Sequence, residues 1–122
     1  MLAVGEYLLG QVDESVLRMT TGLAGGVGCT NQEMCGALSC GALLIGAIHG
    51  RTRSNEDDRQ CQKLVTEYRE RFASELGATL CCTLRANGYA TSGKPTCSAL
   101  VERAANILLD VMNIESGTGQ LR

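Results

Sequence analysis

Seven cysteines supply most of the chemistry available to this chain of 122 residues. A cysteine attacks a substrate or binds a metal as the thiolate, and the unsatisfied N–H groups at a helix N-terminus stabilise that anion. Cys81 and Cys82 fall in the first turn of a short predicted helix. Cys97 falls in the first turn of the last predicted helix, where it heads an apolar stripe and should point inward, and Cys35 lies one turn inside the central helix. These positions predict reactive or metal-ligating thiols, with small buried hydrophobes as the alternative interpretation.

The remaining cysteines are weaker candidates for chemistry. Cys61 continues an apolar stripe with helical spacing, which predicts core packing. The other members of the stripe are Leu64, Val65, Tyr68, Phe72 and Leu76. Cys29 precedes a predicted helix cap and could pack on Met34 as a hydrophobic staple. Cys40 follows Cys35 at a spacing of about 140° around an α-helix, so these two thiols are poor partners for one disulfide or one metal.

Composition limits the classes of function. Because the number of cysteines is odd, they cannot all pair within one chain, and a reducing cytoplasm fits better than a secreted disulfide framework. A single His and the absence of a C-x-x-C motif argue against a zinc finger or a thioredoxin-like site. With a net charge of -2 and 3% aromatic residues, no nucleic-acid partner is expected. The longest apolar stretch, 36–48, is shorter than the ~20 residues of a membrane span.

Helix caps and stops predict an all-α fold: a compact bundle of about five helices in a single domain, 1–122, with a frayed tail at 115–122. The first predicted helix covers residues 1–9, and the second begins at 13 and ends in a GGVG turn at 25–28. The others cover 32–48, a segment that ends at 76, a short segment at 80–85, and 95–112. Gly10, Gly50 and Gly77 are predicted stops, and Pro95 is a predicted first residue. The predicted caps are Asp13, Thr79 and two capping boxes, Thr30–Glu33 and Ser54–Asp57.

The helix at 32–48 is rich in small residues. Gly36, Gly41 and Gly46 recur along it, each followed by Ala. Glycine inside a helix costs roughly 1 kcal/mol relative to Ala, so the repeated glycines predict that other backbone approaches closely. We therefore expect the bundle to form around this helix, which would be covered on several sides.

The pattern GLAGGVG…MCGAL…GAIHGR…GATLC…PTC…LVERAANILL, at about 2–109, resembles the C_GCAxxG_C_C family of redox-active proteins and the related domain of split-Soret cytochromes c. The resemblance implies a small helical domain with a redox role on four cysteines, carried here onto Cys35, Cys81 and Cys97. It also implies that such a domain can hold a non-haem iron centre, although the chain has no C-x-x-C-H haem attachment. Cys40 replaces the second Gly of the family motif. The family's first cysteine would lie before Met1, so the N-terminus is expected to be truncated relative to the family.

The sequence supports three hypotheses. The first is a thiol-based redox or electron-transfer protein, of thiol oxidoreductase type, in which Cys35, Cys81 and Cys97 converge and act on an unknown redox partner. The second is an iron–sulfur or other metal site with the same three ligands, joined by Cys29 or Cys82. The third is a non-catalytic helical dimer or adaptor with inert thiols, since a Gly/Ala-rich bundle with exposed apolar surface is compatible with a homodimer.

Overall fold

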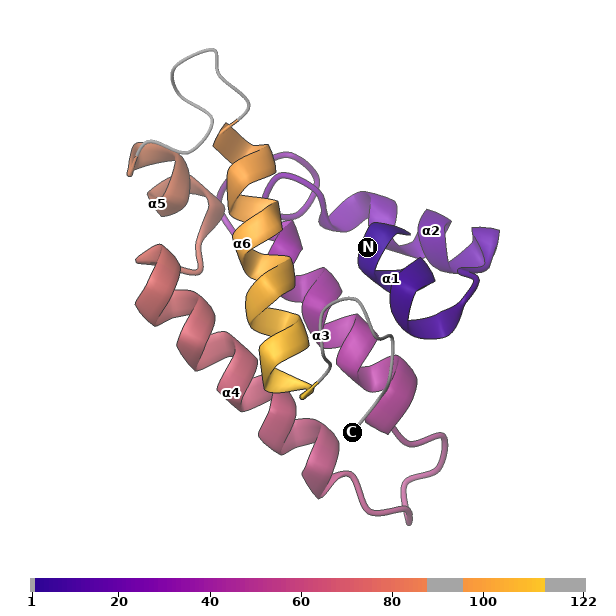
Figure 1. Ribbon diagram of the computed structural model, residues 1–122. Coiled ribbons are helices and arrows are strands. Elements are labelled where there is room, and N and C mark those ends of the chain that lie inside the picture. Colours follow the sequence, from indigo (N-terminus) through magenta and orange to yellow (C-terminus); the bar gives the residue numbers. More distant parts are fainter. Residues whose placement is uncertain (1, 88–95, 114–122) are drawn as a thin grey trace.

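The computed structural model describes residues 2–87 and 96–113, and this part of the chain contains six α-helices, one 3-10 turn and no strand (Figure 1). The elements are α1 (Leu2–Leu9), α2 (Glu14–Thr20), the 3-10 turn η1 (Thr21–Leu23), α3 (Gly36–His49), α4 (Arg59–Leu76), α5 (Cys81–Ala86) and α6 (Thr96–Val111). The prediction of an all-α fold is confirmed. The predicted helix start at Pro95 and the predicted frayed tail at 115–122 lie outside the described residues.

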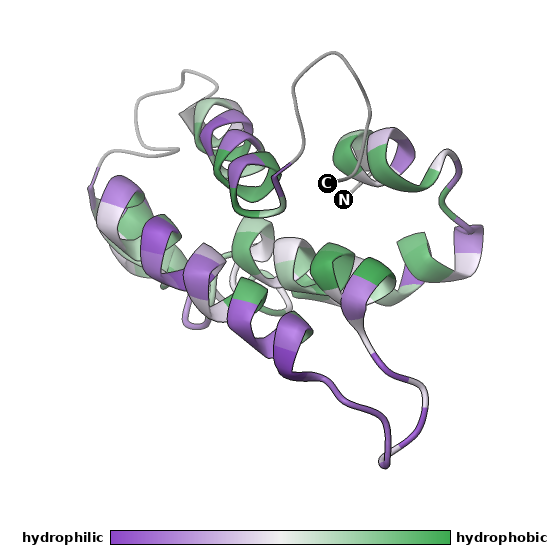
Figure 2. Ribbon diagram, turned by 60° about the horizontal axis from the view of Figure 1, so that its bottom comes forward, coloured by the Kyte–Doolittle hydropathy of each residue, from purple (hydrophilic) through white to green (hydrophobic). Residues whose placement is uncertain are grey.

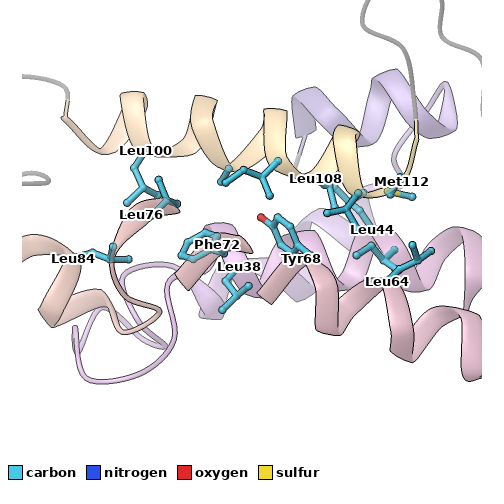
Figure 3. Packing of buried hydrophobic residues seen from close by; sticks show 14 residues of the cluster. Leu38, Leu44, Leu64, Tyr68, Phe72, Leu76, Leu84, Leu100, Leu108 and Met112 are labelled. Carbon is cyan, nitrogen blue, oxygen red and sulfur yellow. The ribbon is translucent and has the colours of Figure 1, made fainter. Parts of the chain in front are cut away.

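Three helices, α3, α4 and α6, pack together around the hydrophobic core (Figure 3). The stripe predicted on α4 is buried at Leu64, Tyr68, Phe72 and Leu76, and Cys61 packs against it partly buried. The rings of Tyr68 and Phe72 meet edge to face, with centroids 6.0 Å apart and planes at 75°. Burial of each such large apolar side chain stabilises the fold by about 1.5–3 kcal/mol. Opposite this stripe lie Leu38, Leu44 and Ile45 of α3 and Leu100, Ala104, Ile107 and Leu108 of α6.

The N-terminal helices lie on the side of α3 away from α4 (Figures 1 and 2). Figure 2 shows that α4 is largely hydrophilic along its outer side, whereas α3 is mostly hydrophobic. Helix α2 ends at Thr20, earlier than predicted, and none of its residues is buried. Val16 of α2 is 38% exposed, so α2 contributes little to the core.

The glycines of α3 serve different purposes. A Cβ at Gly36 would lie 3.2 Å from the carbonyl oxygen of Leu23, so another backbone does approach closely there, as predicted. Gly41 instead makes room for a side chain, because a Cβ at this position would collide with the ring of Tyr68. The prediction is wrong at Gly46, where a Cβ would meet nothing within 4 Å.

The helix stops agree with the sequence better than the caps do. Gly10 and Gly77 have φ of 79° and 93°, and their N–H groups bond to the carbonyls four residues earlier, so both predicted stops are confirmed. Gly50 follows the end of α3, also as predicted. Asp13 occupies the N-cap position of α2, although its side chain forms no capping hydrogen bond.

Neither predicted capping box begins its helix. Helix α3 starts at Gly36 rather than near 32, and the Thr30 hydroxyl donates to the carbonyl of Gly26 at 2.8 Å instead of capping a helix. Helix α4 starts at Arg59, whose N–H donates to the Asp57 carboxylate at 3.0 Å. The cap predicted at Thr79 is also wrong, because Leu80 is the N-cap of α5.

Candidate functional site

A left-handed turn precedes α3. Five consecutive residues, 25–29, have positive φ between 58° and 71°, and Asn31 follows with φ 62°. Two of the five, Val27 and Cys29, are not glycine, and a left-handed conformation costs roughly 1–2 kcal/mol for each such residue. The turn closes on itself through main-chain bonds, including Gly28 N–H to the carbonyl of Gly22 at 2.7 Å. The predicted GGVG turn is therefore longer than expected and of unusual hand.

A short antiparallel bridge joins the starts of α3 and α5. Met34 pairs with Leu80, and on either side the N–H of Cys35 bonds to the carbonyl of Thr79 at 2.8 Å and the N–H of Cys81 to that of Glu33 at 2.9 Å. Because side chains alternate along extended backbone, Cys35 and Cys81 fall on one side of this bridge. Met34 and Leu80 fall on the other, each 42% exposed.

Three of the predicted site residues line one cavity. Cys35, Cys81 and Cys97 contribute to a cavity of about 240 Å³ at the N-terminal ends of α3, α5 and α6. Its apolar wall includes Leu84, Leu100 and Val101. Cys35 is the N-cap of α3 rather than a residue one turn inside the helix. The apolar stripe predicted that Cys97 points into the core, but Cys97 is exposed. It still borders the cavity.

The other four cysteines lie away from this cavity. Cys29 is exposed on the left-handed turn, and Cys82 is exposed beside Thr83, so neither additional ligand predicted from the sequence joins the three. Cys40 lines a second cavity of about 240 Å³ between α3 and α6, as expected from its position on a different face of the helix. Cys61 belongs to the packing around α4.

At Cys35, burial has a larger effect on the thiol pKa than the helix N-terminus has. The half-buried position raises the pKa of the Cys35 thiol, and the nearby thiols of Cys81 and Cys97 raise it further. The main-chain N–H groups of Ala37 and Leu38 act in the opposite direction, as a helix start should. Cys35 is therefore held as the neutral thiol at neutral pH, although the helix start itself favours the thiolate.

Asn31 is the functional candidate that the sequence did not reveal. The Cys81 thiol donates to the Asn31 side-chain oxygen at 3.5 Å, and the Asn31 N–H donates to the carbonyl of Gly25 at 2.8 Å. A Cβ at Gly26 would lie 2.7 Å from the Cβ of Cys81. The left-handed turn thus packs directly on Cys81. Asn tolerates positive φ better than most residues, and this preference was the available signal.

The thiol arrangement does not fit the predicted metal site. Within residues 2–87 and 96–113, no three Cys, His, Asp or Glu side chains are placed to hold one metal ion. Cys35, Cys81 and Cys97 line a common cavity but do not form such a group, whereas an iron–sulfur cluster requires several thiolates around a common point. Among the helices that the structure describes, none has the length and apolar character needed to cross a bilayer.

Comparison with known families shows which family the chain matches. The model of a family described as "Putative redox-active protein (C_GCAxxG_C_C)" matches residues 1–111. This range includes the left-handed turn, the bridge and all three cavity thiols. Neither the curated proteins nor the solved structures yield a match.

Proposed function

This chain belongs to the C_GCAxxG_C_C family of redox-active proteins, and on that premise we propose that it is a thiol–disulfide redox protein. Its working thiols are those of Cys35, Cys81 and Cys97. The observation that supports this proposal is that these three side chains, far apart in the sequence, line a single cavity. A homodimer and a cytoplasmic location stay predictions from the sequence.

The proposal gives the thiols different roles. Cys81 attacks first, because the raised pKa of Cys35 makes that thiol the slower nucleophile at neutral pH. Cys35 resolves the intermediate, since the bridge holds it on the same side as Cys81. Cys97, exposed at the cavity rim, is the second resolving thiol.

The reaction is an exchange of disulfides with a substrate disulfide as the oxidant. The Cys81 thiolate attacks one substrate sulfur, the substrate S–S bond breaks, and one half leaves as a thiol after taking up the proton released by Cys81. The Cys35 sulfur then attacks Cys81 in the mixed disulfide, and its proton goes to the second departing half. Two cysteines have lost two electrons and two protons in total, and the substrate disulfide has gained both.

Closure of the protein disulfide requires a small movement. Cys35 and Cys81 occupy diagonal positions across the bridge, and such positions on an antiparallel pair lie about 7–8 Å apart. Disulfide-bonded residues have Cα atoms about 4.4–6.8 Å apart. Cys81 is the first residue of α5, so a small shift confined to the start of this helix can close the gap while Leu84 keeps the rest of α5 in the core.

The test is to oxidise the reduced, chelator-treated protein anaerobically with glutathione disulfide and to map the products by mass spectrometry. We expect a Cys35–Cys81 disulfide in the parent protein and an accumulated mixed disulfide on Cys81 in a Cys35→Ser, Cys97→Ser double variant. The matched control is Cys82→Ser, which removes the exposed neighbour of Cys81 and should leave the products unchanged.

Two results would contradict this function. If Cys29 and Cys82 are oxidised before any cavity thiol, the cavity has no special reactivity and the thiols are inert in the sense of an adaptor. If anaerobically purified protein is brown and contains iron and sulfide that are lost in Cys35→Ser, the cavity thiols serve as cluster ligands instead.

A further inference from the structure

One charged side chain borders the thiol cavity. Arg85 lines it together with the three cysteines, and the remaining lining residues are uncharged. Arg85 is exposed and forms no ion pair with another residue of the part that the structure describes. By contrast, Arg59 and Arg71 are each paired with a carboxylate, at 2.9 Å in both cases. A positive charge beside the thiols is thus left available to a ligand.

The fold fixes this charge on the face of Cys81. Arg85 follows Cys81 by one helical turn on α5, and residues at i and i+4 share a helix face. Leu84 is 2% exposed and anchors α5 in the core, which sets the orientation of that face. Glu33, whose carbonyl accepts the Cys81 N–H, is the acidic residue nearest the bridge, and its side chain does not line the cavity.

From this geometry we infer that the substrate is a low-molecular-weight disulfide with an anionic substituent near its sulfur atoms, and that Arg85 selects it. The inference rests on the proposed thiol–disulfide function. The guanidinium binds a carboxylate or similar anion, while the apolar wall of Leu84, Leu100 and Val101 packs on the chain beside the sulfur. The volume of about 240 Å³ is below the ~300–1,000 Å³ of pockets for drug-sized ligands, so a short substituent fits best.

Arg85 also offsets an unfavourable interaction in the attack step. The Cys81 thiolate repels an anionic substrate, and a cation one turn away compensates for that repulsion. A single charge about one helical turn away in a water-like environment changes a rate by about threefold, so removal of Arg85 should change the ratio of rates for anionic and cationic substrates by nearly tenfold. Because the cavity is open to solvent at Arg85, salt should weaken the preference.

The test compares three disulfides of similar length and different charge. These are 3,3′-dithiodipropionate, which is anionic, bis(2-hydroxyethyl) disulfide, which is neutral, and cystamine, which is cationic. The rate constant for mixed-disulfide formation on Cys81 is measured anaerobically at low ionic strength in a Cys82→Ser background. Because the three leaving thiols differ in intrinsic reactivity, each rate constant is compared with that of Arg85→Gln, and we expect the parent protein to react about threefold faster with the anionic probe and about threefold slower with the cationic one.

Charge variants assign the preference to Arg85. Arg85→Gln should lower the anionic-to-cationic ratio of rate constants by nearly tenfold, Arg85→Lys should leave the ratio almost unchanged, and about 0.5 M salt should lower it in the parent protein. Arg69→Gln is the control, because Arg69 is an exposed cation on α4 that does not border the cavity. An anionic-to-cationic ratio that is unchanged in Arg85→Gln would overturn the role of Arg85.

The outcomes separate this inference from the function on which it rests. The same relative rates for the three probes in the parent protein and in Arg85→Gln, with normal formation of the Cys35–Cys81 disulfide, would overturn the charge selection and leave the redox function standing. Failure of all three probes to oxidise the cavity thiols would overturn both.

Discussion

Replacing Val27 by Gly should stabilise this protein, although it removes an apolar side chain. Val27 is a β-branched residue at φ 67° in the left-handed turn, a conformation that costs roughly 1–2 kcal/mol outside glycine. Relief of this strain is partly offset, by about 0.5–1 kcal/mol, because glycine has a larger conformational entropy in the unfolded chain. The Val27 side chain is 44% exposed and lies outside the core cluster, so little packing is lost. The expected net effect of Val27→Gly is a stabilisation of about 0.5–1 kcal/mol.

The assay is thermal and urea unfolding of the reduced protein, followed by circular dichroism, with Tm expected to rise by about 2–4 °C. Val16→Gly is the matched control, because Val16 is similarly exposed at 38% but lies in the ordinary right-handed helix α2. There the same substitution should destabilise by up to about 1 kcal/mol. If Val27→Gly lowers stability as much as Val16→Gly does, the strain argument is refuted.

Three further substitutions test the same structure. Gly26→Ala should destabilise by more than about 3 kcal/mol in urea unfolding, because a Cβ would meet that of Cys81 at 2.7 Å and φ is 71°; a loss below about 1 kcal/mol would contradict the contact. Tyr68→Phe should cost about 1 kcal/mol at neutral pH, since the hydroxyl donates to the carbonyl of Ala37 at 3.0 Å. Burial raises the pKa of Tyr68, so the unfolded chain ionises first and stability should fall above about pH 10; Tyr68→Phe should lessen that fall, and an unchanged pH profile would argue against it. The raised pKa of Cys35 has the same effect on stability: its stabilising contribution is present below about pH 8.5 and is lost as pH rises. Cys35→Ser should therefore weaken the pH dependence of the free energy of unfolding above about pH 8.5.

Features of local origin were predictable from the sequence. The apolar stripe of α4 and the stops at Gly10 and Gly77 depend on spacing within a few residues, and all of them appear where expected. The position of Cys81 at a helix start is likewise a local property. These features need no information about distant parts of the chain.

Features that depend on distant residues were mispredicted. The Thr30–Glu33 box looked like the start of α3, but its threonine bonds within the left-handed turn and its glutamate carbonyl pairs with Cys81. The raised pKa of Cys35 could not be predicted for a similar reason, because a helix start is a local feature whereas burial by other helices is not. The proposed roles of Arg85 and Asn31 depend on the fold, which places Arg85 beside the cavity and Asn31 beside Cys81.

The bridge between residues 33–35 and 79–81 determines how specific the effect of a Cys→Ser substitution is. Both Cys35 and Cys81 are tethered through main-chain N–H groups, which serine supplies equally well. Exchange of sulfur for oxygen therefore removes the reactive atom while the scaffold that carries it stays in place. Loss of redox behaviour in such a variant can be attributed to the missing sulfur and not to collapse of its surroundings.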